Sequence, residues 1–385
     1  MKEQAIAWLE TEAQQELAGC RRTAVDGTIL FTPDGQGNYG ALWTRDFAYM
    51  VQNAYHLLDP EEVRAAILYL LHGQRADGCI PDRRQVDGRV VYSAGPADAP
   101  LGDPPTDNAQ FMVDLVHSYV QHSGDSSGRS SGQSLEFARQ HLAALRRALD
   151  WVPRSSGGLV FIPPGQRQSP YGFTDTVAKS GELCFSSLLY WNACQQMAKL
   201  CALCGEAGTA YVERAAQIEG GLERLWDLET GAFRAATDDC RQVDVWASAF
   251  AVYIDFARGE HRERLLRFLR AYYDQIVWHG QVRHLLRGEQ WEKTLIPVAP
   301  ETYQNGAYWA TASGWVWDAL CQVDESLANR MLDDLIQDFC QAGICECINV
   351  RYRKLAHYVV SAVNPLGALK RRAGQVDPSS EETSQ

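Results

Sequence analysis

The chain has 385 residues, of which 46% are hydrophobic, and it carries a formal net charge of −12. A chain of this length can bury a large core, and its acidic balance argues against nucleic acid or an anionic membrane as a partner. No apolar run approaches the roughly 20 residues of a membrane-spanning helix, and the N-terminal residues lack the apolar core of a signal peptide. We therefore expect a soluble, cytoplasmic protein.

Apolar residues recur at helical spacing along most of the chain. Twelve helices are predicted, at residues 3–19, 44–58, 61–75, 106–123, 134–151, 182–204, 208–227, 244–258, 260–278, 304–322, 324–341 and 358–371. Breakers such as Asp59-Pro60, Gly205, Gly259 and Asp324 mark short links, which alternate with long connections at residues 21–43, 76–105, 153–181, 228–242, 280–302 and 342–357. This alternation predicts an all-α fold, an (α/α)6 barrel of six helical hairpins.

The barrel is expected to be one domain over residues 1–372, followed by a disordered acidic tail at 373–385. The Gly/Ser-rich link at 123–134 is expected to be mobile. Few strands are expected, with local pairing at residues 89–92 and 158–162.

Eleven cysteines need an explanation. In a long chain without a secretion signal they are not expected to form a disulfide framework. Cys201 and Cys204 have CxxC spacing, but no second pair with a nearby histidine completes a zinc set. We interpret the cysteines as reduced, small hydrophobic residues and expect neither a metal nor an organic cofactor.

Clusters of carboxylates and aromatic rings stand where each long connection meets the next helix. If the hairpins close into a ring, these clusters gather on one face. Glycoside hydrolysis requires two carboxyl groups in different environments, and aromatic rings suit the apolar faces of sugars. The residues expected to bind substrate are Trp43, Arg45, Asp46, Asp107, Asn108, Tyr171, Asp244, Trp246, Glu301, Tyr303, Gln304, Asn305 and Trp309.

Three short segments, each at or near the junction of a long connection with a helix, resemble motifs of a known family. Trp43-Thr-Arg-Asp46, the loop Gly172-Phe-Thr-Asp175 and Glu346-Cys-Ile-Asn349 resemble motifs of the six-hairpin glycosidases, namely the inverting α-glucosidases related to processing glucosidase I, trehalase and glucosylglycerate hydrolase. The resemblance implies that Asp46 holds the terminal sugar, Asp175 is the general acid and Glu346 is the general base. Inversion would place the two catalytic carboxyls roughly 6.5–9.5 Å apart.

Two of these assignments have competitors. Glu182 follows Ser180-Gly181 and could replace Asp175 as the acid, although a predicted helix start would stabilise its charge. Glu301 could replace Glu346 as the base. Asp107 could be an ordinary N-cap, and Arg45 could pair with Asp46 for structural reasons.

Other functions fit the same barrel. A sugar epimerase or isomerase would work through histidines, and His279, His284 and His357 lie in or beside the long connections. A non-catalytic carbohydrate-binding barrel and a glycoside phosphorylase are further alternatives. The separate acid and base candidates favour a glycosidase acting on a small soluble carbohydrate, while the sugar, the linkage and the oligomeric state stay open.

Overall fold

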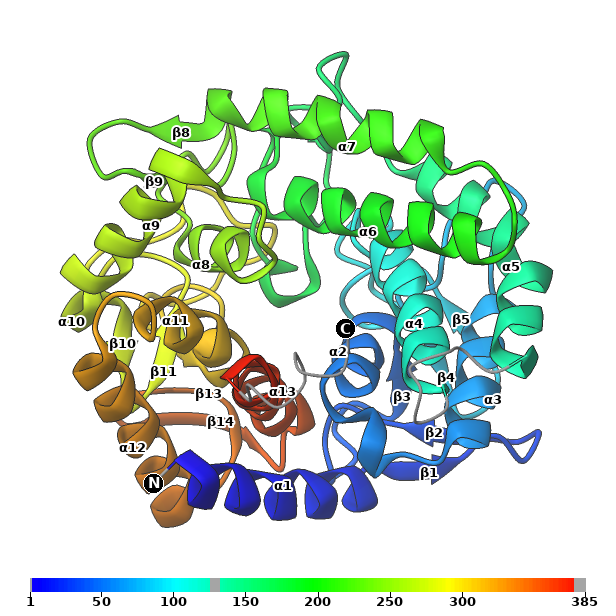
Figure 1. The fold of residues 1–385 in the computed structure, drawn as a ribbon, viewed down its shortest axis with the longest axis horizontal. Coiled ribbons are helices and arrows are strands. Elements are labelled where there is room, and N and C mark those ends of the chain that lie inside the picture. The colour runs from blue at the N-terminus through cyan, green and yellow to red at the C-terminus, as the bar shows by residue number, and fades with distance from the viewer. Residues whose placement is uncertain (1, 125–131, 377–385) are drawn as a thin grey trace, which may run out of the picture.

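The computed structural model describes residues 2–124 and 132–376. Most of the helices are arranged in two concentric rings, one inside the other (Figure 1). The inner helices are α2 (Thr44–Ala54), α4 (Asn108–His122), α6 (Cys184–Leu203), α8 (Val245–Tyr253), α11 (Ser313–Leu320) and α13 (Val359–Val376); the outer helices are α1 (Lys2–Gly19), α3 (Pro60–Leu71), α5 (Gly132–Trp151), α7 (Thr209–Gly221), α9 (Gly259–Ala271) and α12 (Glu325–Ala342). Each inner helix contacts the next, and α13 contacts both α11 and α2, so the inner ring is closed.

Local sequence explains how the helices start and which side they bury. Asp59 caps α3 by accepting hydrogen bonds from the backbone N–H groups of Glu61 and Glu62, and Pro60 occupies the first helical position. Asp324 caps α12 in the same way through the N–H of Leu327. Outer helices bury a single stripe, which in α12 is Ala328, Met331, Leu332, Leu335 and Phe339.

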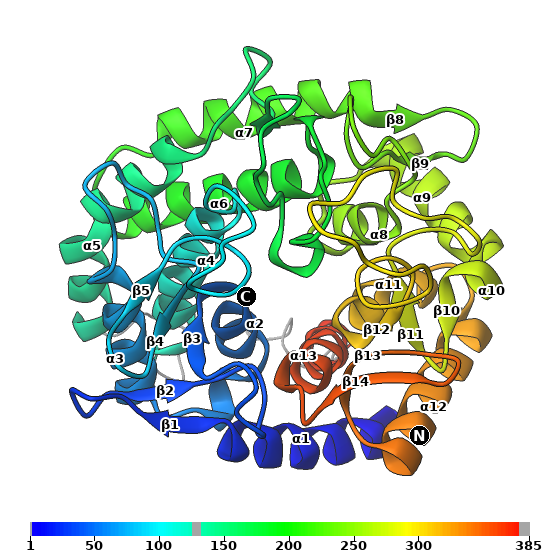
Figure 2. The same ribbon diagram turned by 180° about the vertical axis from the view of Figure 1, so that it is seen from behind.

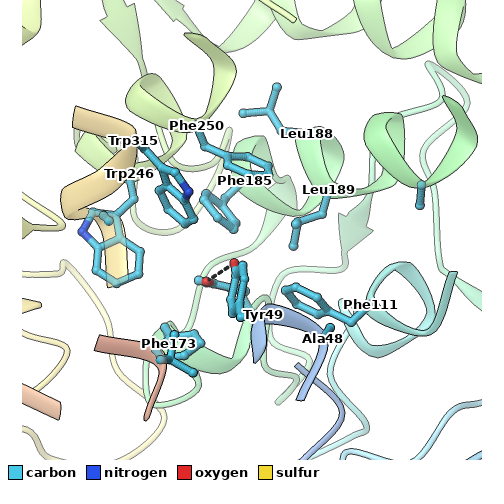
Figure 3. Packing of buried hydrophobic residues seen from close by; sticks show 14 of the residues in the cluster. Ala48, Tyr49, Phe111, Phe173, Phe185, Leu188, Leu189, Trp246, Phe250 and Trp315 are labelled. Atoms are coloured by element: carbon cyan, nitrogen blue, oxygen red, sulfur yellow. Dashed lines mark hydrogen bonds between the residues drawn. The ribbon is translucent and has the colours of Figure 1, made fainter. Parts of the chain in front are cut away.

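Inner helices are buried on almost every side. Aromatic residues from several of them meet near the centre of the ring, where Tyr49, Phe111, Phe173, Phe185 and Trp315 lie close together (Figure 3). The hydroxyl groups of Tyr49 and Tyr171 are hydrogen-bonded at 2.9 Å. This aromatic centre fills the middle of the ring, so the space left for a ligand lies towards one end of it.

Short strands are more numerous than the sequence suggested. They are β1 (Arg21–Thr23), β2 (Ile29–Phe31), β3 (Ala41–Trp43), β4 (Arg83–Gln85), β5 (Val90–Val91), β6 (Phe161–Ile162), β7 (Gly181–Glu182), β8 (Trp226–Asp227), β9 (Ala232–Phe233), β10 (Val277–Trp278), β11 (Gln281–Arg283), β12 (Tyr308–Trp309), β13 (Cys345–Asn349) and β14 (Tyr352–Ala356). All six predicted long connections carry strands, and these connections gather on the face seen in Figure 2. The pairing at residues 90–91 and 161–162 agrees with the prediction.

The largest sheet has the order β10-β11-β12-β13-β14 and is antiparallel throughout. It corrects the predicted helix at 304–322, because residues 304–307 form a turn, β12 follows, a short 3₁₀ helix occupies Ala310–Ala312, and α11 starts only at Ser313. Tyr308 pairs with both Arg283 and Ile348. These partners are distant in sequence, so helical periodicity could not reveal the strand.

Other boundaries differ by a few residues. The predicted helix at 260–278 is divided into α9 and a short helix α10 (Tyr273–Ile276). The last helix, α13, continues to Val376, beyond the predicted boundary at 372. Most of the link at 123–134, namely residues 125–131, and residues 377–385 lie outside the described residues. In the described part of the chain, no helix combines the length and apolar character needed to cross a bilayer.

Candidate active site

A cavity of about 330 Å³ opens where the long connections meet the starts of α2 and α13. Half of the residues that the sequence singled out line it. The residues around it are Pro33, Tyr39, Trp43, Arg45, Asp46, Gly172, Phe173, Asp175, Tyr303, Gln304, Trp309, Glu346 and Tyr358. Carboxylates therefore share one small space with several aromatic rings, as the sequence predicted.

Asp175 lies at the end of a 3₁₀ turn over Gly172–Thr174. Burial raises the pKa of its carboxyl to about 6. Its one hydrogen-bonded side-chain partner is neutral: Nε2 of Gln304 donates to Oδ1 at 2.8 Å. The charge of Arg45 and this hydrogen bond both lower the pKa, but burial outweighs them, so the protonated form of Asp175 is accessible near pH 6.

Glu346 lies in β13 and is 2% exposed. Burial raises the pKa of its carboxyl to about 7. Each oxygen nevertheless has its own donor, since the hydroxyl of Tyr39 donates to Oε1 at 2.8 Å and the ammonium group of Lys354 donates to Oε2 at 2.6 Å. Nζ of Lys354 also donates to the Tyr39 hydroxyl at 3.1 Å.

The two carboxyls differ in which charge state their neighbours favour. By pKa alone, Glu346 would take up a proton before Asp175. The direct contacts favour the opposite order, because the ammonium group of Lys354 lies 2.6 Å from Glu346 and its positive charge stabilises the ionised carboxylate, whereas Asp175 has a neutral amide at the same range. We therefore interpret Glu346, which has the ammonium group of Lys354 and the hydroxyl of Tyr39 as donors, as the ionised group.

Arg45 and Asp46 lie in the first turn of α2, and both are buried. Arg45 does not form the expected pair with Asp46. Its Nη1 donates to Asp82 at 2.6 Å, and Asp46 instead accepts a hydrogen bond of 2.6 Å from the hydroxyl of Tyr358. Burial raises the pKa of Asp46 to about 6. Asp46 thus faces the cavity without a direct ion pair.

Trp43 forms an aromatic wall of the cavity. The guanidinium of Arg83 lies 4.4 Å from the centre of its ring, and Tyr39 meets the ring edge-on at 5.5 Å. The indole Nε1 is buried and has no hydrogen-bond partner among the described residues. The part of Trp43 that lines the cavity offers a rigid aromatic surface of the kind that packs against the apolar faces of sugars.

Asp107 and Asn108 stand behind the cavity. Asp107 precedes α4 but makes no capping hydrogen bond; its Oδ2 accepts from the N–H of Gly172 at 2.9 Å. Asn108 accepts from Nη1 of Arg45 at 3.3 Å. Both residues therefore support Gly172 and Arg45. Asp107 does occupy the N-cap position of α4, as the sequence allowed, but its side chain does not cap the helix.

The two competing carboxylates lie elsewhere. Glu182 belongs to strand β7, since α6 begins at Cys184, and its oxygens accept from Ser155 at 2.6 Å and from Arg224 at 2.7 and 2.6 Å. The hydrogen bonds from Arg224 lower its pKa. Glu301 forms an ion pair of 3.0 Å with Arg283. Neither residue lines the cavity.

Four further predicted residues serve the surrounding structure. Asp244 caps α8 and pairs with Lys179 at 3.1 Å. Trp246 is fully buried and stacks on His284, with ring centres 3.8 Å apart. Asn305 accepts from the backbone N–H of Trp291 at 3.0 Å. The fourth, Tyr171, is hydrogen-bonded to Tyr49, and none of the four lines the cavity.

Sequence analysis missed several cavity residues. Tyr39 and Tyr358 were passed over, although both stand close to quoted motifs and bear hydroxyls that contact cavity carboxylates. Lys354 and Asp82, which do not line the cavity but contact Glu346 and Arg45, were not considered either. The signal for Lys354 was the position of a cation just after Glu346 in a segment long enough for a hairpin, which β13 and β14 form.

A wider cleft continues outwards from the cavity, with an empty volume of about 1290 Å³. The cavity and this outer cleft share Tyr39, Trp43, Asp175 and Tyr303. The remaining walls of the outer cleft come mainly from β3, β4 and the loop at 95–101. A ligand in the cavity can therefore extend past Asp175 into the outer cleft.

The eleven cysteines are free thiols, and all but three of them are buried. Over residues 2–124 and 132–376, no group of three or more His, Cys, Asp or Glu side chains is placed to hold a metal ion.

No family model and no curated protein matches the chain. Several solved structures, in contrast, are similar to it in fold. A GH63 mannosylglycerate hydrolase from Thermus thermophilus, in complex with glucose, is 18% identical, with a TM-score of 0.65 over 93% of this chain and 99% of that one. A GH78 rhamnosidase from Bacillus sp. GL1 is 13% identical, with a TM-score of 0.63 over 96% of this chain and 35% of that one.

A rhamnosidase from Klebsiella oxytoca with rhamnose bound gives a TM-score of 0.61 at 15% identity, over 97% of this chain and 64% of that one. The chain therefore has the six-hairpin fold of these glycosidases, as the sequence predicted. At such identities the likeness establishes the fold alone.

Proposed function

We propose that the protein is a glycoside hydrolase whose helices form an (α/α)6 barrel and whose active site is the cavity described above. The observation that carries this proposal is the pair of buried carboxyls, Asp175 and Glu346, that face one small aromatic cavity with pKa values raised to about 6 and 7. Solved structures with this fold include one with glucose bound and one with rhamnose bound, which supports a sugar as the ligand.

We assign Asp175 as the general acid and Glu346 as the general base of an inverting reaction. Asp175 protonates the glycosidic oxygen while the bond from this oxygen to the anomeric carbon breaks. Glu346 takes a proton from a water molecule whose oxygen bonds to the opposite face of the same carbon. Asp175 is then ionised and Glu346 protonated, and exchange with solvent restores both.

The shape of the site supports action at the end of a small soluble glycoside. Asp46 and Trp43 line the cavity, where they would hold the terminal sugar, and the leaving group would occupy the outer cleft beyond Asp175. Phe173, Tyr303 and Trp309 offer further rings to its apolar faces. We infer an exo-acting enzyme of the α-glucosidase type.

The epimerase alternative has less support. His284 is buried against Trp246, His279 and His357 are partly exposed and pair with Asp338 and Glu16, and none of the three lines the cavity.

The decisive experiment is a hydrolysis panel of α- and β-linked disaccharides and glycosylated small acids, followed by proton NMR of the first-formed anomer. We expect release of a free sugar with inverted configuration. Release with retained configuration would overturn the inverting mechanism, and isomerisation without cleavage would overturn the hydrolase assignment.

A further inference from the structure

The side chain of Gln304 is fully buried, and its amide forms hydrogen bonds with the segment at 172–176. Its Oε1 accepts from the backbone N–H and the hydroxyl of Thr176, at 2.8 and 2.7 Å. Its Nε2 donates to Oδ1 of Asp175 at 2.8 Å and to the carbonyl oxygen of Gly172 at 3.3 Å. An amide offers two hydrogens and two lone pairs, so no capacity remains for a sugar hydroxyl.

The orientation of this amide is fixed by chemistry. A backbone N–H can only donate, so the atom of Gln304 that faces Thr176 must be the oxygen. The nitrogen consequently faces Asp175 and the carbonyl of Gly172. Gln304 is therefore hydrogen-bonded to both ends of the segment 172–176, which carries the proposed acid.

The turn that carries Gln304 also contacts the strand of the proposed base. Nδ2 of Asn349, the last residue of β13, donates to the carbonyl oxygen of Glu301 at 2.8 Å and to its carboxylate at 3.0 Å. Arg283, which is fully buried, holds the same carboxylate. Positive φ angles of 60° at Glu301 and 43° at Tyr303 show how tightly this turn is bent.

We propose, on the basis of the hydrolase function above, that Gln304 is a positioning residue that aims the carboxyl of Asp175. The turn at 301–306 joins the segment of the acid to the strand of the base, so that the spacing of the two carboxyls is set by one element. This role replaces the sugar contact that the sequence suggested for Gln304.

The test uses Gln304→Met, which removes all four hydrogen bonds while nearly conserving volume. Gln281→Met is the matched control, because Gln281 is also buried and donates to an aspartate, Asp338, at 3.0 Å, away from the cavity. We expect kcat of Gln304→Met to fall about 100-fold, with KM changed by less than about threefold. We expect Gln281→Met to retain the wild-type kcat and pH profile.

The pH profile separates positioning from general loosening. Loss of the amide donor raises the pKa of Asp175, so the alkaline limb of kcat/KM for Gln304→Met moves to higher pH. Gln304→Glu keeps an acceptor for Thr176 but places an acidic oxygen beside Asp175, which moves the limb further in the same direction. This second variant decides the question if Gln304→Met does not fold.

Two outcomes would overturn the inference and leave the hydrolase function intact. In the first, Gln304→Met matches Gln281→Met in kcat and alkaline limb while Asp175→Asn is inactive. In the second, KM rises with kcat unchanged, as for a sugar contact.

If the wild-type protein cleaves no glycoside, the proposed function fails, and carbon-13 NMR titration of the Asp175 carboxyl decides the inference without substrate. The signal is identified by its loss in Asp175→Asn. An upward shift from about 6 in Gln304→Met supports the positioning role, and an unchanged pKa refutes it.

Discussion

Asp175 and Glu182 belong to one segment of the chain, yet the fold gives them opposite environments. Asp175 faces a cavity, has a neutral amide as its hydrogen-bonded side-chain partner, and has a pKa raised by burial. Glu182 pairs with Arg224 and has a lowered pKa. The difference lies in burial and contact. Asp175 is the more deeply buried of the two and has no direct ion pair among the described residues, so burial outweighs the charge of Arg45, whereas Glu182 is bonded directly to its arginine.

The same contrast separates Glu346 from Glu301. Glu301 is tied to a buried arginine and to Asn349 and stabilises a turn. Glu346 faces the cavity with a lysine and a tyrosine as donors. Lysine presents a single compact charge where arginine presents a two-pronged guanidinium, so the pairing places one positive charge beside one oxygen of Glu346.

The largest effect should come from the cavity carboxyls. Asp175→Asn and Glu346→Gln should each lower kcat/KM by about 10²–10⁴-fold, because each removes one of the two groups proposed to transfer protons. Glu182→Gln should stay within about threefold of the wild type. Steady-state kinetics on the best substrate of the panel checks all three variants. Loss of turnover in Glu182→Gln, with Asp175→Asn active, would move the acid to Glu182 and break the comparison.

A smaller effect is expected at Asp46. Asp46→Asn should raise KM by about 10–100-fold with little change in kcat, because a charged hydrogen bond to the terminal sugar contributes about 1.5–3 kcal/mol. Asparagine resembles the protonated acid, so the gap between variant and wild type should narrow below pH 6, the approximate pKa of Asp46. A pH series of KM values checks this point, and a gap independent of pH would show that the charge of Asp46 plays no part.

A substitution at Lys354 tests the proposed role of Glu346 as the base. Lys354→Met removes a positive charge from Glu346, so the pKa of this base rises above about 7. The base must be ionised to act, and the acidic limb of kcat/KM therefore moves to higher pH, with activity at pH 7 lowered about tenfold for each pH unit that the limb moves. Lys354→Arg should restore most of the limb. An unmoved limb would show that Glu346 is not the titrating base.

Asp114 is another buried carboxyl without an ion pair among the described residues, and we expect its substitution to change the free energy of unfolding and to leave activity unchanged. It lies in α4, about 9 Å along the helix from Asn108. It accepts hydrogen bonds from the neutral side chains of Gln52 and Gln196, and burial raises its pKa to about 7. A raised carboxyl pKa makes folding less favourable as pH rises from about 4 to 7, because the unfolded state loses its proton first.

Asp114→Asn should therefore stabilise the protein at pH 8, by an amount on the order of 2 kcal/mol, and change little below pH 4. The new amide can donate to Oε1 of Gln196, which has no partner among the described residues. Urea unfolding at both pH values measures the difference. Equal stability at pH 8 would show that Asp114 carries no buried charge, while activity should be retained in either case.

The helical part of the fold could be predicted from the sequence because its signals are local. Asp59-Pro60 caps and starts a helix by contacts within one turn, and the stripe in α12 is visible as a repeat. Strand β12 could not be predicted, since Tyr308 depends on partners in two other connections. Regular spacing reports burial along one element, and it says nothing about pairing between elements.

The candidate site divides in the same way. Trp43, Asp46, Asp175 and Glu346 were found because they belong to compact motifs, and the structure brings them into one cavity. Their partners were missed or misassigned. Lys354 reaches Glu346 across a hairpin, and Gln304 holds Asp175 from a distant connection. The sequence favoured Asp175 over Glu182 on the ground that Glu182 starts a helix, but the charge of Glu182 is in fact stabilised by Arg224, a long-range contact that the sequence could not reveal.

The packing of Gly172 against Arg45 has a consequence for distant relatives of this chain. Any β-carbon at position 172 would overlap the Arg45 side chain, which cannot withdraw because Asp82 and Asn108 hold its guanidinium. The two positions are thus sterically coupled. In an alignment they should covary, with a larger residue at 172 appearing only where 45 is short, so this pair offers a way to recognise sequences that keep the same cavity when overall identity is too low to do so.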